Sequence, residues 1–255
     1  AFEANGQYDE ALDSWQFATA SQPERLDVQL AAAQLAEKRL RAAEALARTA
    51  HLGEGLARFG EALRELLPHL RIAEERADIE AAEVAFAKLC RGARAVIFFG
   101  TGGSSLGGQT LAQLGGWHIP GVANADQMKR PRTRFYDNLD GDTLASSLRS
   151  FDALDTVRFV IISKSGGTPE TLVQALAALD AVKVAGYANR IPDLFLGVSE
   201  PRADGKANGL RTLFEAHGIP LLDHHPGIGG RFSALTNVGL LAAIARGLAA
   251  RAVRD

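Results

Sequence analysis

The sequence has very little sulfur: one cysteine and one methionine among 255 residues. A single cysteine, Cys90, excludes an intramolecular disulfide and a zinc site built from cysteines, and we expect it to be a small buried hydrophobe. An excess of one charge is also missing, because the formal net charge is −2. The sequence therefore predicts no binding to nucleic acid or to an anionic membrane. No apolar run reaches the roughly 18 residues that a membrane span needs.

The first residues, Ala-Phe-Glu-Ala-Asn-Gly, lack the basic head and the apolar core of a secretory signal. Together with the low cysteine content, this predicts a cytoplasmic protein. The absence of an initiator methionine indicates a trimmed chain or a part of a longer one. Hydrophobic residues make up 47% and charged residues 23% of the chain, as is typical of a folded globular protein. The length predicts one large domain or two small ones.

Two regions differ in their pattern. Residues 1–90 are rich in Ala, Leu, Glu and Arg, which are strong helix formers, and they predict a helical segment that packs on the core. Over residues 91–250, short apolar runs alternate with helical patterns. The expected strands are residues 95–99, 134–137, 157–162, 194–198 and 219–222. This alternation predicts an α/β fold with a doubly wound parallel sheet, which binds ligands at the carboxyl ends of its strands.

A glycine-rich segment, residues 100–107 (the first loop), follows the first expected strand. Gly102, Gly103 and Ser104 let the backbone approach a ligand and turn its N–H groups toward an anion. The loop lacks the Lys-Ser/Thr ending of a P-loop, and Ser105 stands where a dinucleotide fingerprint needs its third glycine. The loop therefore favours phosphate binding without a nucleotide motif, and the alternative is a tight strand-to-helix turn with no ligand.

Residues 163–171 (the second loop), directly after the third expected strand, are rich in hydroxyl side chains and include a lysine. These side chains are Ser163, Lys164, Ser165, Thr168 and Thr171. Thr168 is a good N-cap and Pro169 a good first helical residue, and we expect Leu172, Leu176 and Leu179 to form the buried stripe of the helix that follows. Hydroxyls and N–H groups at a helix N-terminus suit a phosphate. Capping alone accounts for Thr168 but not for the whole group.

Residues 227–233 (the third loop) place three glycines before Arg231. A guanidinium is permanently charged and can hold an anionic oxygen with several donors. The alternative is a surface arginine after a flexible turn. The nearby pair His224 and His225 is expected to be a polar loop, because adjacent residues on an extended segment do not easily face one site.

In this order the three loops resemble the motifs of the phosphoglucose isomerase family. Those motifs are Gly-x-Gly-Gly-Ser-x-Leu-Gly, Ser-Lys-(Ser/Thr)-x-x-Thr-x-Glu-Thr and Gly-Gly-Arg-(Phe/Tyr)-Ser. The stretch Asn138-Leu139-Asp140 is similar to an Asn-x-Asp segment that the family has between the first two. The resemblance spans about residues 92–250. It implies a domain of the sugar isomerase (SIS) type, a flavodoxin-like sandwich.

The resemblance also implies a role for each matching residue. The phosphate ligands would be Ser163, Ser165, Thr168 and Thr171, with Lys164 nearby. Gly102, Gly103 and Ser104 match the loop that lines the sugar, and Glu170 matches a glutamate near the active centre. Arg231 matches the arginine that stabilises an enediolate. Several members carry threonine where this chain has Gly167, so a backbone N–H is expected to replace one hydroxyl.

The activity implied is the cofactor-free interconversion of glucose 6-phosphate and fructose 6-phosphate, with no metal, in a homodimer. The family takes its general base (a glutamate), its ring-opening histidine and a late lysine from a second SIS domain. We expect that domain to be absent from this chain, which would make the chain the N-terminal portion of an isomerase. The alternative is a non-catalytic SIS module that binds a phosphosugar and regulates a partner. A nucleotide-binding enzyme is disfavoured.

Overall fold

The computed structural model describes residues 41, 60, 71–119 and 129–255. Residues Ile72–Asp255 form one compact unit. The predicted helical segment, residues 1–90, falls largely outside the described residues, and the predicted domain boundary at residues 90 and 91 stays a prediction. The compact unit includes the helix that precedes residue 91, because Phe86 and Leu89 of that helix belong to the core beside the sheet.

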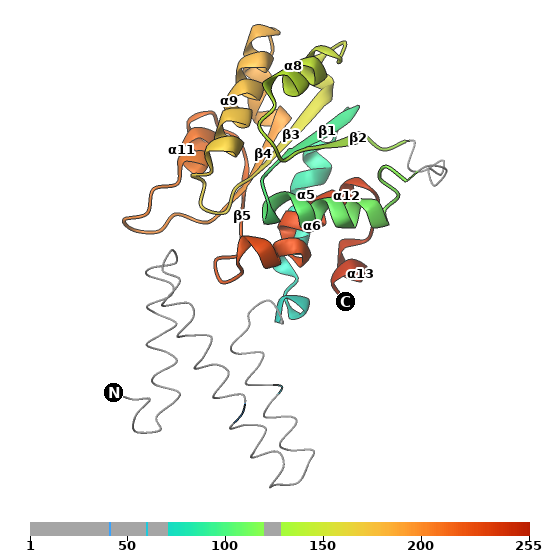
Figure 1. Ribbon diagram of the computed structural model, residues 1–255, viewed down its shortest axis with the longest axis vertical. Coiled ribbons are helices and arrows are strands. Elements are labelled where there is room, and N and C mark those ends of the chain that lie inside the picture. The colour runs from blue at the N-terminus through green and yellow to red at the C-terminus, as the bar shows by residue number, and fades with distance from the viewer. Residues whose placement is uncertain (1–40, 42–59, 61–70, 120–128) are drawn as a thin grey trace. The chain divides into compact units, whose positions relative to one another are not determined.

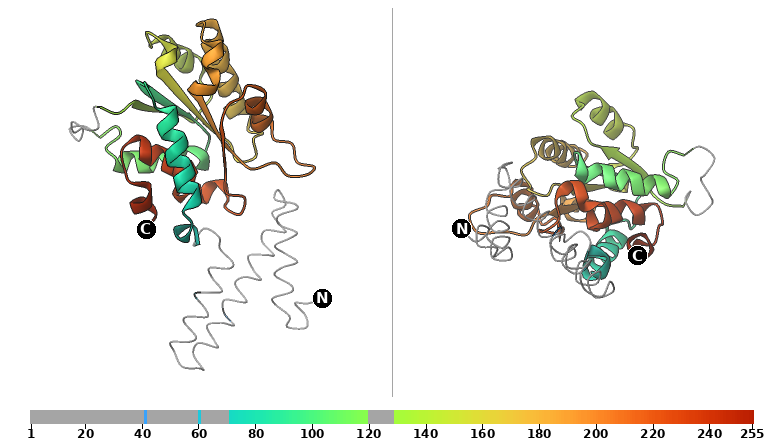
Figure 2. Two further views of the ribbon diagram at one scale, coloured as in Figure 1. Left: turned by 180° about the vertical axis from the view of Figure 1, so that it is seen from behind. Right: turned by 60° about the horizontal axis from the view of Figure 1, so that its bottom comes forward.

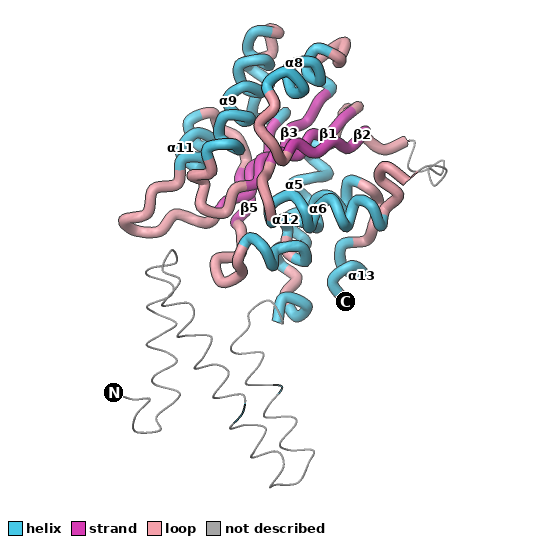
Figure 3. The backbone as a smooth tube through the Cα atoms, in the orientation of Figure 1, coloured by secondary structure: helices cyan, strands magenta, loops and turns pink. Residues whose placement is uncertain are grey.

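A five-stranded parallel sheet forms the centre of this unit (Figures 1 and 3). Its strands are β1 (Ala95–Phe99), β2 (Arg132–Tyr136), β3 (Val157–Ile162), β4 (Phe195–Ser199) and β5 (Leu221–Asp223). They lie in the order β2-β1-β3-β4-β5. The predicted α/β fold with a doubly wound parallel sheet is confirmed.

Strands β1 and β3 have the predicted bounds, and all of their residues are buried. β1 is a continuous apolar run, and β3 is apolar except for the buried Arg158, because helices cover both faces of the sheet. The edge strand β5 was predicted at residues 219–222 but begins at Leu221, and it is only partly buried. An edge strand has less apolar surface to bury, so its sequence signal is weaker.

One face of the sheet is covered by α8 (Gly141–Arg149), α9 (Pro169–Val184), α10 (Ile191–Leu194) and α11 (Gly209–Ala216). A row of aromatic rings from β1, β3 and β4 fills this side. The ring centroids of Phe99 and Phe159 are 6.1 Å apart and those of Phe159 and Phe195 are 4.7 Å apart. Phe214 of α11 extends the row with an edge-on contact at 6.5 Å. Such pairs add about 0.5–1.5 kcal/mol beyond their buried area.

The other face is covered by α5 (Ala77–Leu89), α6 (Gly103–Leu114) and α12 (Asn237–Ala245), as Figure 2 shows from behind and below. These helices pack on Val96, Phe98, Val160, Ile162 and Leu196. A short last helix, α13 (Ala250–Arg254), follows α12. Short 3₁₀ helices occur at Ile72–Glu74, Leu154–Thr156, Ala188–Arg190 and Gly230–Leu235.

Two expectations about individual residues need correction. The predicted buried stripe of α9 is wrong at Leu176, which is 51% exposed. The helix instead turns Thr171, Ala175 and Ala178 toward the sheet, because the aromatic rings already fill the space and leave room for small residues. Cys90 is only partly buried, although burial raises the pKa of its thiol to about 12.

Candidate functional site

The order of the strands determines where the loops meet. The first loop follows β1 and the second follows β3, and these two strands are neighbours in the sheet. The helices that continue from them lie on opposite faces, α6 on one and α9 on the other. A doubly wound sheet opens a crevice at such a switch point, outside the carboxyl ends of its strands. The predicted loops therefore flank the position where this fold binds ligands.

The first and third loops touch each other. A Cβ atom on Gly103 would lie 2.3 Å from the carbonyl oxygen of Gly230 and 2.7 Å from the Cα of Arg231. One helical turn further, a Cβ on Gly107 would lie 2.7 Å from the Cβ of Ala234. Glycine is therefore needed at both positions for the backbones to approach. Gly102 has φ 53° and is exposed, and Ser104 is half-buried.

The second loop leads into α9 with its hydroxyls only partly used. Thr168 stands at the N-cap and Pro169 at the first position, as predicted, but the Thr168 side chain makes no capping hydrogen bond. Its hydroxyl instead accepts from Ser163 Oγ at 3.2 Å. Ser165 is exposed, and its Oγ accepts from the backbone N–H of Gly167 at 3.3 Å. The Thr171 hydroxyl is buried and has no hydrogen-bond partner among the described residues.

Lys164 ties the second loop to the third. Its ammonium donates to the carbonyl oxygens of Pro226 at 3.2 Å and Ile228 at 2.9 Å, and it pairs with Glu200 at 3.3 Å. Burial alone would raise the pKa of the Glu200 carboxyl, but the hydrogen bond from Lys206 and the charge of Lys164 outweigh it and hold this pKa below its usual value. Lys164 thus holds two loops together through groups of the protein itself.

Arg231 lies in the 3₁₀ turn Gly230–Leu235, and its side chain is exposed. Within residues 71–119 and 129–255, no hydrogen bond or ion pair involves its guanidinium. The same is true of the half-buried Glu170 carboxylate in the first turn of α9. Both side chains are thus available to a ligand.

The segment that follows β2 contacts the helices on both sides of it through Asp137 and Asp140. Gln109 of α6 donates to Asp137 Oδ2 and to Ser105 Oγ, both at 2.8 Å. Asp140 caps α8 by accepting from the backbone N–H of Thr143 at 3.0 Å, and this hydrogen bond is the main cause that lowers the pKa of the Asp140 carboxyl. The segment is therefore anchored to both α6 and α8.

Asn208 is a residue of the site that the sequence analysis missed. Gly166 has φ 66°, and a Cβ atom there would lie 1.7 Å from Asn208 Oδ1. The backbone N–H of Leu210 donates to the carbonyl of Gly166 at 2.8 Å, and Asn208 Nδ2 donates to Ser199 Oγ at 2.8 Å. Asn208 also caps α11 through the N–H of Arg211. The Asn-Gly pair before an apolar helix signals such a cap, but no local pattern reveals its packing under the second loop.

The two histidines have different surroundings, as expected for adjacent residues. His224 is fully buried, its Nδ1 lies 3.0 Å from the carbonyl oxygen of His225, and its Nε2 has no partner among the described residues. Burial is the main cause that lowers the pKa of His224. His225 instead faces Glu75, at 3.3 Å. No group of three metal-binding side chains occurs in the part of the chain that the structure describes.

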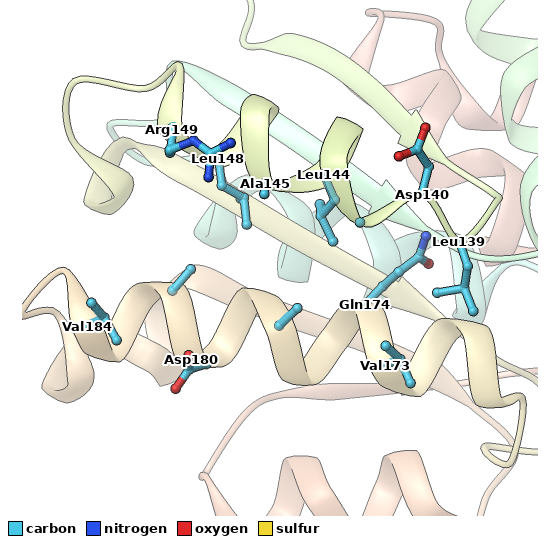
Figure 4. A pocket seen from close by; sticks show the side chains of 13 residues that line it. Leu139, Asp140, Leu144, Ala145, Leu148, Arg149, Val173, Gln174, Asp180 and Val184 are labelled. Atoms are coloured by element: carbon cyan, nitrogen blue, oxygen red, sulfur yellow. The ribbon is translucent and has the colours of Figure 1, made fainter.

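An apolar groove of about 390 Å³ lies between α8 and α9, away from the third loop (Figure 4). Leu144 and Leu148 of α8 line it together with Val173 and Val184 of α9. Its lining is mostly aliphatic, and a phosphate needs hydrogen-bond donors. The groove is therefore not the expected phosphate site.

Comparison with known proteins identifies the family. The model of the family described as "PGI: Phosphoglucose isomerase" matches residues 80–251, more than half of the chain. This chain belongs to the phosphoglucose isomerase family. The resemblance that the three loops carry is thus confirmed.

Two curated members of the phosphoglucose isomerase family show how much of a relative is matched. A glucose-6-phosphate isomerase of Carboxydothermus hydrogenoformans is 33% identical over 154 residues, which cover 60% of this chain and 32% of the relative. One of Acaryochloris marina is 36% identical over 158 residues, covering 61% of this chain and 27% of the relative. This chain therefore spans about a third of the length of the relatives it matches.

A solved structure supports the fold. A hypothetical protein from Thermus thermophilus superposes with a TM-score of 0.56 at 24% identity, over 79% of this chain and 48% of that chain. Among the described residues, no helix combines the length and the hydropathy that crossing a membrane requires.

Proposed function

We propose that this chain binds a hexose phosphate in the crevice between the first, second and third loops. We further propose that it supplies this site to a glucose-6-phosphate isomerase, as the N-terminal SIS-domain portion of that enzyme. Such an enzyme moves a proton between C2 and C1 of the open sugar through an enediolate. The proposal follows from the family and from the named activity of the curated relatives.

One observation carries the binding proposal: hydrogen-bond donors without protein partners gather at the start of α9. Within the described residues, the backbone N–H groups of Glu170 and Thr171 have no acceptor. The Thr168 hydroxyl makes no capping bond. The positive end of the helix dipole lies at the same place, so a phosphate dianion there gains both hydrogen bonds and charge stabilisation. Ser163 and Ser165 complete the proposed cradle from the loop.

The remaining proposed contacts follow from this position. Gly102, Gly103 and Ser104 would face the sugar, because the first loop lies across the switch point from the second. Arg231 would place its cation beside the developing enediolate oxygen. Lys164 would act through the loops it connects, since its ammonium already has three protein partners.

The catalytic base does not come from these residues in our proposal. The family resemblance assigns it to a glutamate of a second SIS domain, together with the ring-opening histidine. We therefore propose ligand binding for this chain and isomerisation for a protein that carries both halves. The homodimer and the cytoplasmic location stay predictions.

Thermal unfolding with added ligand tests the binding proposal. At 100 times its dissociation constant, a ligand stabilises the folded state by about 2.7 kcal/mol. For a unit of this size, roughly 2–4 °C per kcal/mol gives an expected rise in Tm of about 5–11 °C with glucose 6-phosphate. Glucose without phosphate should give no rise. Equal Tm values with and without every hexose phosphate would refute the site.

Thr168→Val separates phosphate binding from helix capping. The side chain makes no capping bond, but it accepts a hydrogen bond from Ser163 Oγ, whose loss should cost about 1 kcal/mol. We therefore expect the apo Tm to fall by about 2–4 °C and the affinity for glucose 6-phosphate to fall about tenfold, or 1.4 kcal/mol. A residue that only caps would cost a similar amount of stability, about 1 kcal/mol, but would leave the affinity unchanged. Thr110→Val on the exposed side of α6 is the matched control.

Turnover tests the catalytic part. The 255-residue chain should bind glucose 6-phosphate without forming fructose 6-phosphate, and a chain that also carries the second half should form it. Turnover by the 255-residue chain alone would overturn the assignment of the base. Binding without turnover in the longer protein would favour the regulatory module.

A further inference from the structure

A polar cleft lies at the amino ends of β1 and β2, the edge of the sheet opposite to the three loops. Its volume is about 560 Å³, within the range of small-molecule sites. Four cationic residues line it: Arg94, Lys129, Arg130 and Arg132. The segment between α8 and β3 forms the rest of the wall, including Phe151 and Asp152.

The cleft is positively charged in a chain whose net charge is −2. All four cationic side chains are exposed, and Asp152 is the one carboxylate among the described lining residues. Within residues 71–119 and 129–255, no hydrogen bond or ion pair is found for the side chains of Arg94, Arg130 or Arg132. These three arginines thus share one concave surface without neutralising partners in that part of the chain, which raises the local concentration of anions.

The backbone beneath two of these side chains is fixed by the sheet. Arg132 is the first residue of β2 and pairs in register with Ala95, next to Arg94. The N–H of Arg132 donates to the carbonyl of Arg94 at 2.9 Å, and the N–H of Arg94 donates to the carbonyl of Thr156 at 2.8 Å. The two arginines therefore start from neighbouring, hydrogen-bonded backbone segments, which lie about 4.8 Å apart in such a sheet.

Arg130 extends the positive charge toward α12. Arg246 at the end of α12 has its pKa lowered by burial first and by the charge of Arg130 second. Arg130 also packs against Gly247, where a Cβ atom would lie 2.5 Å from its guanidinium carbon. The cations thus extend from the strand ends to the residues after α12.

We propose that this cleft binds a small molecule carrying two or more linked phosphate groups. Arginine matches phosphate geometry with paired N–H donors, and cations spread over the cleft can contact more than one phosphate. The nearby hydroxyls cannot donate to it as readily, because Ser150 Oγ donates to the carbonyl of Ser147 and Thr156 Oγ1 to that of Ala153. The charge of the arginines therefore supplies the recognition.

This cleft is separate from the hexose-phosphate crevice. The two lie at opposite ends of β1, which spans five residues and hence roughly 13 Å at 3.3 Å per residue. Binding at the amino edge therefore does not depend on the proposed function of the carboxyl edge. A single phosphate suits the crevice, and linked phosphates suit the cleft.

Calorimetric titration of the 255-residue chain with tripolyphosphate at low salt tests the proposal. We expect at least tenfold tighter binding than for inorganic phosphate. Arg94→Ala combined with Arg132→Ala should weaken tripolyphosphate binding at least tenfold. Replacement of the same two residues by Lys should weaken it less, since the charge stays and the paired donors are lost. The control pair Lys183→Ala and Arg202→Ala removes two exposed cations that do not line the cleft, and it should change the affinity less than twofold.

Two further titrations identify the ligand class and test whether the two sites are independent. If ATP binds as tightly as tripolyphosphate, the phosphate chain alone is recognised, and tighter ATP binding indicates a nucleotide as the ligand. Saturating glucose 6-phosphate should leave tripolyphosphate binding unchanged. Absence of tripolyphosphate binding, or equal binding by the wild type and by a double alanine variant that melts normally, would overturn the proposal.

Discussion

Gly103 connects the first and third loops, so replacing it with alanine should force them apart. The new Cβ would lie 2.3 Å, 2.5 Å and 2.7 Å from the oxygen and carbon of Gly230 and the Cα of Arg231. All three are backbone atoms, which cannot rotate away as a side chain can. The third loop must therefore shift by about 1 Å to reach ordinary contact distances near 3.5 Å.

Overpacking of this kind costs typically 1–3 kcal/mol. With roughly 2–4 °C per kcal/mol for 150–250 residues, we expect Gly103→Ala to lower the Tm by about 4–8 °C for a cost near 2 kcal/mol. Because Arg231 moves with the third loop, affinity for glucose 6-phosphate should also fall, about tenfold if one charged contact is lost. Thermal melts with and without this ligand measure both effects.

Gly141→Ala is the matched control. Gly141 begins α8, and a Cβ atom there would meet no heavy atom within 4 Å. Alanine is a better helix former than glycine, so the Tm should stay or rise slightly. If both variants melt at the same temperature and bind glucose 6-phosphate equally, the loops are not in the contact described, and our account of the site is wrong.

Three other perturbations test the site and its support. Lys164→Met removes the hydrogen bonds between the second and third loops and should cost about 1–2 kcal/mol in a urea melt, whereas an unchanged midpoint would show that the loops hold without it. Buried His224 has a lowered pKa and so takes up a proton less readily than the unfolded chain, for which the usual value is 6.5. Stability should therefore fall between pH 7 and pH 5, and His224→Gln should flatten that dependence; parallel pH profiles would contradict this. Arg254→Met leaves the buried side of Asp78 and the carbonyl of Leu235 unpaired and should cost about 3 kcal/mol. The exposed neighbour Arg251→Ala should cost at most about 1 kcal/mol, and equal losses would refute the distinction.

The sequence alone was sufficient to predict an element of the fold where one local pattern dominated. The runs at residues 95–99 and 157–162 predicted β1 and β3 without error, because a strand buried on both faces is apolar at nearly every position, with Arg158 as the exception here. The start of α9 was also predicted, since Thr168-Pro169 carries a strong local signal. The exposure of Leu176 was not predicted, because Leu176 and Ala175 compete for the sheet and only the aromatic rings of the strands decide between them. Leu172 and Leu179, in contrast, pack on the core as expected.

The sequence predicted the loops of the candidate site but not the contacts between them. Three loops with the right residue types could be read from the sequence, together with the edge of the sheet at which they gather. The sequence could not predict that Lys164 donates to the carbonyl oxygens of Pro226 and Ile228, because any anion is an equally good partner for a lysine on sequence grounds. The packing of Asn208 beneath Gly166 also depends on a contact between distant segments.

The late position of α12 in the chain affects how the protein is made. Strands β1 to β4 are complete once Ser199 has left the ribosome, but α12, one of the three helices in the core cluster with Val96 and Phe98, begins only at Asn237. A nascent chain must therefore keep part of one apolar sheet face shielded while the last residues are synthesised, a stage at which partly folded chains tend to aggregate. The third loop is also translated just before α12, so no partly synthesised chain presents the complete crevice.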